Sequence, residues 1–422
     1  MINLTDYKNM LQEIGENAKF SSQSLKRAST YKKNKALVFA SEHLKENINY
    51  ILAENKKDLT FAEKKQISKS LIDRMILDES RVYSIIQGLQ KISTLPDPVG
   101  KKINSREMPN GLKINRIQVP IGVIGIIYES RPNVTADAGA LCLKSGNAAI
   151  LRSGSESFFS SKAIMESLKY GIDKAGLSLN SIQLIPTKDR EAVGEMLNLN
   201  KYIDILVPRG GNSLIERVFK NTSIPLIAHL DGNCHTYVHK DADLELSKKI
   251  IKNAKLRRTS ICGATESVLI DDEILESHLK PIVSELVNNG CEVRGDKKIQ
   301  DLDPRINAAS DEDWRKEYLD AIVSIKSTKN IDSAIKHIEK YGSNHTDAIL
   351  TSNAKAAKKF ITEVDSAIVM HNTSTQFADG GEFGLGAEIG ISTGRLHARG
   401  PVGLDQLVTY KWVVIGQGQI RN

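Results

Sequence analysis

The chain has 422 residues, of which 40% are hydrophobic and 26% are charged, and its formal net charge is +7 at pH 7. This length suffices for two or three domains, and the composition is that of an ordinary soluble globular protein. No apolar run approaches the ~20 residues needed to span a bilayer, so the sequence predicts no membrane-spanning helix.

The thiols and the N-terminus indicate the compartment. The first residues, MINLTDYKNMLQEIG, contain neither a basic nor an apolar segment, so we expect no signal peptide. The four cysteines are far apart and form neither a CxxC pair nor a metal-finger spacing; they are Cys142, Cys234, Cys262 and Cys291. We therefore expect reduced thiols, a cytoplasmic location and no metal site.

The positive charge raises the question of nucleic-acid binding. Lysines gather in the first hundred residues, as in KRASTYKKNK (26–35), where we expect a solvated helical face. No nucleic-acid-binding module is recognisable, and the scattered aromatic residues form no stacking platform. A mildly basic chain also suits an enzyme that handles phosphorylated, anionic ligands.

The N-terminal part is predicted to be helical from residue 5 to about 95. Apolar residues recur at helical spacing between Leu37 and Ile51, and two prolines at 96 and 98 end this block. The following segment, 97–120, has Pro-Asn-Gly between two extended stretches, which predicts a β-hairpin.

From residue 121 the pattern becomes an alternation of strands and helices. The run IGVIGIIY is typical of a strand buried on both faces. The predicted strands are 121–128, 148–152, 181–186, 202–208 and 224–229, and then 235–239, 266–271, 320–326, 347–352 and 366–372. This alternation predicts two doubly wound α/β domains with parallel sheets and a seam near 229–235. The tail from Leu404 is predicted to be one more extended segment.

Two strand-to-helix loops of the first domain suit an anion. ILRSGSES (150–157) offers backbone amides and Arg152, whose guanidinium can pair with a phosphate. VPRGGNS (207–213) sets Arg209, Gly210 and Gly211 before a helix N-terminus, whose partial charge is positive. Neither loop is a GxGxxG or Walker motif, so ordinary tight turns are the alternative. Together they favour a dinucleotide site.

Asn133 and Cys262 are the candidate catalytic residues. In YESRPNVTADAG (128–139), Asn133 lies at a strand-to-helix corner, either as an oxyanion donor or as an ordinary N-cap. In RRTSICGATE (257–266), two arginines precede Cys262, and cations lower the pKa of a thiol. Taken alone, that motif favours a structural or incidental cysteine. Cys234 beside His235 is the rival nucleophile, although we expect it to be a packing residue.

Longer stretches are similar to the aldehyde dehydrogenase superfamily and, within it, closely resemble the gamma-glutamyl phosphate reductases. The resemblance runs from about residue 20 to the end. It rests on 119–157, VPRGG (207–211), DGNCHTYV (231–238), EDWRKEYLD (312–320), YGSNHTDAIL (341–350) and FADGGEFGLGAEIGISTGRLHARGP (377–401). The last motif is long enough to identify the family by itself.

The resemblance implies an aldehyde-dehydrogenase-like fold with two doubly wound domains and a small β oligomerisation element. Residues 1–101 and 120–229 would bind the cofactor, 230–403 would form the catalytic domain, and 102–119 with 404–422 would make the oligomerisation element. It also implies NADPH-dependent reduction of L-glutamyl 5-phosphate to L-glutamate 5-semialdehyde and phosphate, in proline biosynthesis. A homo-oligomer is expected, and direct association with a glutamate kinase is left open because the acyl phosphate is labile.

Residue by residue, the resemblance implies a thioester on Cys262, with Asn133 and the Cys262 amide as the oxyanion hole. Arg152 takes the place of a lysine common in the superfamily, and an arginine there suits the extra phosphate of NADPH. The residues implied to bind the cofactor are Arg152, Ser153, Gly154, Ser155, Arg209, Gly210, Gly211 and Glu317, the last at the nicotinamide ribose. Beside the thiol, Thr259 and Gly263 stand where the family pattern has Pro and Asn.

His229 aligns with the glutamate that activates water in aldehyde-oxidising relatives, and its replacement suits a thioester that accepts hydride. Substrate contacts are predicted for Asn344, His345, Ser374 and Thr375, each of which has an alternative role as a turn residue. Two alternative functions stay open at this point: an NAD(P)-dependent dehydrogenase that oxidises another semialdehyde, and a catalytically silent nucleotide-binding or scaffold protein.

Overall fold

The computed structural model describes residues 4–67 and 69–421, and the chain divides into two compact units. Unit 1 comprises Met1–Ala228, Gly384–Gly390 and Val402–Asn422, and unit 2 comprises His229–Phe383 and Ile391–Pro401. Among the described residues, no helix combines the length and the apolar character that crossing a bilayer requires.

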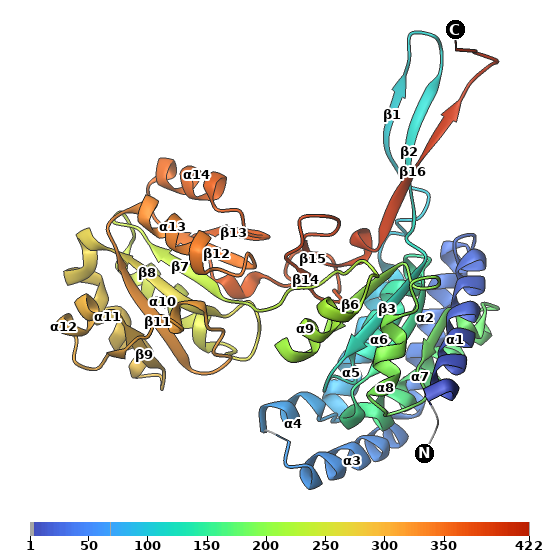
Figure 1. The fold of residues 1–422 in the computed structure, drawn as a ribbon, viewed down its shortest axis with the longest axis horizontal. Helices are drawn as coiled ribbons and strands as arrows, with labels where there is room; N and C mark the ends of the chain where they lie inside the picture. The colour runs from blue at the N-terminus through green and yellow to red at the C-terminus, as the bar shows by residue number, and fades with distance from the viewer. Residues whose placement is uncertain (1–3, 68, 422) are drawn as a thin grey trace. The chain divides into compact units, whose positions relative to one another are not determined.

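Five helices precede the first strand of unit 1, which confirms the helical prediction (Figure 1). They are α1 (Leu4–Leu25), α2 (Thr30–Glu46), α3 (Ile48–Lys64), α4 (Lys69–Met75) and α5 (Glu79–Thr94). The side chain of Asp78 caps α5 by accepting a hydrogen bond from the Arg81 amide, which stabilises the helix start. The solvated face expected for 26–35 has one exception, because Lys33 is buried and pairs with Asp97.

A four-stranded parallel sheet in the order β5-β4-β3-β6 forms the centre of unit 1. Its strands are β3 (Val123–Tyr128), β4 (Ala148–Ser153), β5 (Ile182–Leu184) and β6 (Ile205–Arg209), and the connecting helices are α6 (Val134–Lys144), α7 (Phe158–Lys174), α8 (Glu191–Leu197) and α9 (Asn212–Asn221). The prediction of a fifth strand at 224–229 is wrong, because that segment makes a single bridge between Leu206 and Leu226. Pro225 has no amide hydrogen and cannot extend the ladder.

A separate three-stranded antiparallel sheet contains β1 (Lys102–Glu107), β2 (Lys113–Pro120) and β16 (Val408–Ile415). The predicted hairpin is confirmed by the pairing of β1 with β2, and Gly111 in its turn has φ +84°, a conformation that glycine adopts easily. β2 pairs with β16 along its whole length, from Pro120 opposite Val408 to Lys113 opposite Ile415.

Unit 2 is built on a seven-stranded parallel sheet in the order β10-β9-β11-β8-β7-β12-β13. Five of its strands match the predicted segments: β7 (Cys234–Val238), β8 (Thr265–Asp271), β11 (Ile322–Thr328), β12 (Thr346–Leu350) and β13 (Ile368–His371). The sequence analysis missed the short β9 (Glu292–Gly295) and β10 (Asn307–Ala308) at one edge.

The helices of unit 2 are α10 (Leu244–Leu256), α11 (Leu275–Val287), α12 (Lys297–Leu302), α13 (Ile331–Tyr341) and α14 (Ala354–Glu363) (Figure 1). A two-residue pair, β14 (Ile391–Ser392) with β15 (Gly400–Pro401), completes the unit. Because β7 lies between β8 and β12 in a parallel sheet, the segments that lead into these three strands meet at the amino ends of the strands. This end of the sheet positions the candidate nucleophile.

Candidate active site

Cys262 lies in the loop between α10 and β8 and is the one partly exposed thiol, since Cys142, Cys234 and Cys291 are buried. One side of Cys262 packs against a small apolar cluster that includes Ile368, Met370 and Ile391. A reagent can therefore reach this thiol, while its neighbours on that side restrict how it moves.

Two histidines face Cys262 from the segments that precede β7 and β12. The ligand-forming atoms of His229, Cys262 and His345 all lie within 4.8 Å of one another, and the two imidazole centroids are 5.0 Å apart. Nδ1 of His229 lies 2.7 Å from the carbonyl oxygen of Ile391, and Nδ1 of His345 lies 2.9 Å from Oγ1 of Thr346. Each ring is thus oriented by a contact on its Nδ1 side.

The imidazoles decide the charge of the Cys262 thiol. Burial by itself raises the pKa of Cys262, but the charges of His345 and His229 and their hydrogen bonds lower that pKa well below its ordinary value. The expectation that the preceding arginines do this is wrong: Arg257 donates from Nε to Oε1 of Gln376, 2.9 Å away. The two imidazoles therefore favour the thiolate form of Cys262, which is the reactive form of cysteine.

Cys234, the rival nucleophile, has the environment of a structural thiol. Its Sγ is buried and donates to the carbonyl oxygen of Cys262 at 3.0 Å. Burial and the nearby carboxylate of Asp347 raise the pKa of Cys234 well above its usual value. The neighbouring His235 contacts Asp347 instead, with Nδ1 3.0 Å from Oδ1. Cys234 thus supports the Cys262 loop, as a packing residue does.

Two acids complete the surroundings of the thiol. Burial, followed by the negative charge of Cys262, raises the pKa of Glu317 to about 7. Burial also raises the pKa of Asp231, while the charges of His229 and His345 act in the opposite direction. The predicted ribose-binding Glu317 therefore lies in the electrostatic field of the nucleophile and titrates near neutrality.

The four predicted substrate residues do not form one group. His345 lies beside the thiol. Asn344 is exposed with φ +58°. Ser374 accepts a hydrogen bond from the Gln376 amide at 3.3 Å, and Thr375 Oγ1 lies 3.0 Å from Oγ1 of Thr265. Ser374 thus makes the local turn contact that was its alternative role, whereas the partner of Thr375 is a side chain of β8, far along the chain.

The predicted cofactor loops converge at one edge of the unit 1 sheet. The register sets Tyr128 of β3 beside Ser153 of β4 on one side and Arg209 of β6 on the other. Since these strands are parallel, the loops that follow them lie together at their carboxyl ends, where doubly wound sheets bind ligands.

Arg152 is in strand β4, as the predicted strand 148–152 had it, and lies just before the loop that joins β4 to α7. It is 3% exposed, and its Nη2 donates to the carbonyl oxygens of Lys188 at 3.0 Å and Asp189 at 3.2 Å. Its Nε and the Oγ of Ser153 are buried and have no hydrogen-bond partner among the described residues. Unsatisfied buried polar atoms are rare, so these two donors are candidates for hydrogen bonds to a ligand.

The glycines of both loops make close contacts with carboxylates. A Cβ on Gly154 would lie 2.0 Å from Oε1 of Glu156, and one on Gly210 would lie 2.4 Å from Oε2 of Glu129. The Gly211 amide, expected along a pyrophosphate, donates to Oε2 of Glu129 at 3.0 Å. Gly211 has no side chain to cap α9, so the helix N-terminus keeps amides that can bind an anion.

Asn133 occupies the N-cap position of α6, but its side chain does not cap the helix. Its Nδ2 donates instead to Oδ2 of Asp137 at 2.9 Å, one turn further on. Burial raises the pKa of Asp137 to about 6, while the hydrogen bond from Asn133 acts in the opposite direction. The alternative of an ordinary N-cap is therefore wrong, and one amide hydrogen of Asn133 remains for another acceptor.

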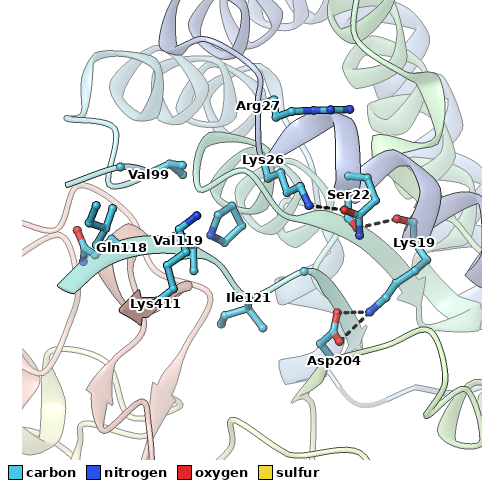
Figure 2. A pocket seen from close by; sticks show the side chains of 15 residues that line it. Lys19, Ser22, Lys26, Arg27, Val99, Gln118, Val119, Ile121, Asp204 and Lys411 are labelled. Carbon is cyan, nitrogen blue, oxygen red and sulfur yellow. Dashed lines mark hydrogen bonds and ion pairs between the residues drawn. The ribbon is translucent and has the colours of Figure 1, made fainter. Parts of the chain in front are cut away.

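A cavity of about 540 Å³ in unit 1 lies between α1 and the strands β2 and β16. Figure 2 shows four cationic side chains around it, Lys19, Lys26, Arg27 and Lys411, and the ion pair of Lys19 with Asp204 at 2.9 Å. None of the predicted site residues lines this cavity, so the basic side chains there are separate from the predicted chemistry.

Sequence reasoning missed three features of the site: the contact of His345 with the thiol, the effect of both histidines on its pKa, and Asp137 behind Asn133. The i, i+4 spacing of Asn133 and Asp137 within a predicted helix was an available signal. No local pattern joins His229 to His345.

The pH dependence of alkylation tests the thiolate. We expect the rate at which iodoacetamide labels Cys262 to have a midpoint well below the ordinary pKa of a thiol, because the imidazoles stabilise the thiolate. His345→Gln removes one of these charges and should move the midpoint upward. The measurement is the labelled Cys262 peptide by mass spectrometry over a pH series.

His278→Gln is the matched control, because His278 is another buried histidine of unit 2 but contacts Ser277 and Ala242. Its midpoint should equal that of the unmodified chain. If the midpoint is the same in His345→Gln as in the unmodified chain, His345 does not set the charge of the thiol.

Comparison with known proteins gives a consistent result. The family model described as "Aldehyde dehydrogenase family" matches residues 40–312. The chain is 54% identical to a gamma-glutamyl phosphate reductase of Parvibaculum lavamentivorans over 417 residues, 99% of this chain and 98% of the relative. It is 53% identical to that of Paramagnetospirillum magneticum over 421 residues, 100% of both chains.

Solved structures agree with this result. The crystal structure of gamma-glutamyl phosphate reductase from Thermotoga maritima has a TM-score of 0.95 and 43% identity, and the match covers 98% of this chain and 100% of that chain. An acetylating aldehyde dehydrogenase from Geobacillus thermoglucosidasius has a TM-score of 0.71 at 15% identity, with 99% of each chain covered, which shows the shared fold. The chain therefore belongs to the aldehyde dehydrogenase family and, within it, to the gamma-glutamyl phosphate reductases.

Proposed function

We propose that this chain reduces L-glutamyl 5-phosphate to L-glutamate 5-semialdehyde and phosphate with NADPH, through a thioester on Cys262. This reaction would be the second step of proline biosynthesis from glutamate. The observation that supports it best is a thiol within 4.8 Å of two imidazoles in a chain that is 54% identical to a named gamma-glutamyl phosphate reductase over nearly its whole length.

The residues around Cys262 suit attack on an acyl phosphate. The thiolate forms a C–S bond to the acyl carbon, and the bond from that carbon to the phosphate oxygen breaks, so phosphate leaves with the electron pair. His345 and His229 stabilise the thiolate before the attack. They stabilise it again when it is released with the aldehyde, because the same negative charge reappears on sulfur.

His229 favours reduction over hydrolysis. Oxidising relatives of the family have a glutamate at the corresponding position to activate water, whereas Nδ1 of His229 contacts the Ile391 carbonyl 2.7 Å away and the ring faces the thiolate. An imidazole that stabilises a thiolate is a poor base for water at the same time. This argument disfavours the alternative of a dehydrogenase that oxidises another semialdehyde.

The edge of the unit 1 sheet fits a dinucleotide with an extra phosphate. Arg152 Nε and Ser153 Oγ are unpartnered buried donors, and the N-terminus of α9 has no side-chain cap. Arg152 would hold the additional phosphate, and the amides at Gly210 and Gly211 would lie along the pyrophosphate. When bound, NADPH supplies the hydride that reduces the acyl group.

The three-stranded sheet suits association with a second copy of the chain. Tyr410, Trp412, Val414 and Ile415 of β16 are 45–57% exposed, an unusual density of large apolar side chains for one solvated strand. We propose that this sheet forms the homo-oligomer interface. Transfer of the acyl phosphate from a bound glutamate kinase is a further proposal, which rests on the lability of that compound alone.

The reverse reaction tests the proposed function. Purified protein with glutamate semialdehyde and NADP should form NADPH only when phosphate is present, because phosphate releases the thioester. Cys262→Ala should abolish this turnover, since the other thiols are buried. Cys234→Ala should retain turnover at a reduced rate, because this thiol holds the Cys262 loop without reacting. Formation of NADPH without phosphate would favour an oxidising dehydrogenase. If activity survives in Cys262→Ala and is lost in Cys234→Ala, the nucleophile is Cys234.

The role of Asn133 is tested by its truncation. Asn133→Ala should lower kcat about a hundredfold, the usual loss for one oxyanion donor, and should leave the Kd of NADPH unchanged. Asp137→Ala should lower kcat by less, because Asp137 only orients the amide of Asn133. A change confined to KM in Asn133→Ala would contradict an oxyanion role.

The role of Arg152 is tested by cofactor discrimination. A charge-assisted hydrogen bond to the extra phosphate contributes roughly 1.5–3 kcal/mol, so kcat/KM should favour NADPH over NADH by about 10- to 150-fold. Arg152→Ala should reduce this ratio, while Arg152→Lys should keep part of it. Arg152 also holds the carbonyls of Lys188 and Asp189. If that is its only role, the substitutions weaken both cofactors equally and leave the ratio unchanged.

Glu317 predicts a pH dependence of cofactor binding. With its pKa raised to about 7, Glu317 loses its charge as the pH falls through neutrality, and a protonated carboxyl accepts ribose hydrogen bonds less well. The affinity for NADPH should therefore fall below pH 7, by at most about tenfold per pH unit for one proton. Fluorescence titrations from pH 5.5 to 8.5 measure it. Glu317→Gln should flatten the profile, and a slope that persists in this variant would assign the proton to another group.

A further inference from the structure

The cluster of Cys262, His229 and His345 has a property that its proposed chemistry does not use. Each residue offers one atom that can bind a metal ion, and the three atoms lie within 4.8 Å of one another. They come from three separate segments that meet because β7 lies between β8 and β12. Sequence spacing therefore gives no sign of this cluster, and the expectation of no metal site rested on such spacing.

The orientation of the two imidazoles suits metal binding. Nδ1 of His229 lies 2.7 Å from the Ile391 carbonyl oxygen, so this nitrogen carries a proton, and Nε2 is the nitrogen that would bind a metal ion after giving up any proton that it holds. Metal-binding histidines commonly donate their other ring N–H to a carbonyl, which fixes the ring and its tautomer.

His345 adds an independent observation. The residue is fully buried, with Nδ1 2.9 Å from Thr346 Oγ1 and 3.6 Å from Cys234 Sγ. Its buried Nε2 has no hydrogen-bond partner in the part of the chain that the structure describes, apart from its interaction with the Cys262 thiol. A metal ion bound to Cys262 would take the place of that single interaction and satisfy the buried nitrogen.

The donor set selects the metal. One thiolate with two imidazoles is a soft-to-borderline set that suits Zn²⁺, which takes four ligands at about 2.3 Å from sulfur and about 2.0 Å from nitrogen. Three protein ligands leave the fourth position to water. Small rotations of the side chains would bring ligand atoms that are now within 4.8 Å to these distances.

We propose that Cys262, His229 and His345 form an inhibitory Zn²⁺ site. Zn²⁺ binds the sulfur as thiolate and each imidazole as a neutral ring, so protons held on the imidazoles leave for solvent and no electrons are transferred. The bound metal occupies the electron pair with which sulfur would attack the substrate, and it covers both imidazoles. A chelator that removes the metal restores the free thiolate. The binding site is independent of the proposed function, and the inhibition rests on Cys262 being the nucleophile.

Zinc binding is measured on the full chain without substrate. The metal-free protein, kept reduced with a phosphine, is titrated with Zn²⁺ in competition with a chromophoric chelator. We expect each chain to bind one Zn²⁺ ion tightly. Cys262→Ser, His229→Gln or His345→Gln should lower the affinity for Zn²⁺ at least about a hundredfold, because even the groups that only hold metal ligands in place contribute 10- to 100-fold to metal affinity. Cys291→Ser and His278→Gln are matched controls and should bind Zn²⁺ like the unmodified chain.

Two measurements on the unmodified chain keep the test independent of how the variants fold. X-ray absorption at the zinc edge should show one sulfur at about 2.3 Å and nitrogen ligands at about 2.0 Å. Zn²⁺ should block labelling of Cys262 by iodoacetamide, and a chelator should restore it. The proposed site is wrong if the chain binds no Zn²⁺ tightly, if the bound zinc has no sulfur ligand, or if Cys262→Ser still binds Zn²⁺ as tightly as the unmodified chain. Zinc bound by these three ligands with turnover unchanged would overturn the inhibition and, with it, the role proposed for Cys262.

Discussion

The contact of one thiolate with two imidazoles is the interaction on which the chemistry of this chain depends. Burial alone makes a thiol inert, as Cys291 shows, where it raises the pKa to about 12. Cys262 is also enclosed, yet the charges of His345 and His229 lower its pKa. The difference between a structural and a reactive cysteine in the same unit is therefore electrostatic and not a matter of exposure alone.

The contact of the thiol with the imidazoles depends in turn on the segments at the amino ends of the unit 2 strands. Buried polar contacts hold these segments in place. Asn233, just before β7, donates to the carbonyl oxygens of Trp314 and Tyr341, both at 2.9 Å. The Cys234 thiol donates to the carbonyl of Cys262 and so holds the loop. A Cβ on Gly232 would lie 2.3 Å from that same carbonyl oxygen, so only glycine permits this approach. The site is thus built from backbone positions as much as from side chains.

Elements that depend on local pattern could be predicted from the sequence. Alternating apolar runs located most strands of both sheets, and the Asn-Gly turn located the hairpin. Local pattern failed where a partner far along the chain decides the outcome. In the apolar segment 224–229, the Pro225 carbonyl accepts from the Leu206 amide and the Ile227 amide donates to the Leu206 carbonyl, but Pro225 has no amide hydrogen with which to extend the ladder.

The site shows the same division between local and distant causes. Cys262 was assigned as the nucleophile from the family resemblance, because its own motif favours a structural cysteine. Histidines from two other segments lower its pKa, while Arg257, beside it in sequence, pairs with Gln376. Arg152 was located correctly along the chain, but its burial against the carbonyls of Lys188 and Asp189 depends on the packing around β4. Charge and burial are sums over neighbours in space, so residue order alone does not determine them.

The pairing of β2 with β16 has a consequence for synthesis on the ribosome. The hairpin strand Lys113–Pro120 precedes unit 2 in the sequence, whereas its partner Val408–Ile415 follows unit 2. Throughout translation of unit 2, the outer edge of β2 exposes unpaired amides and carbonyls, the kind of edge that recruits strands from other chains. Unit 1 can complete this sheet only after unit 2 has been made. The nascent chain therefore has an aggregation-prone edge until Val408–Ile415 has been made and pairs with β2.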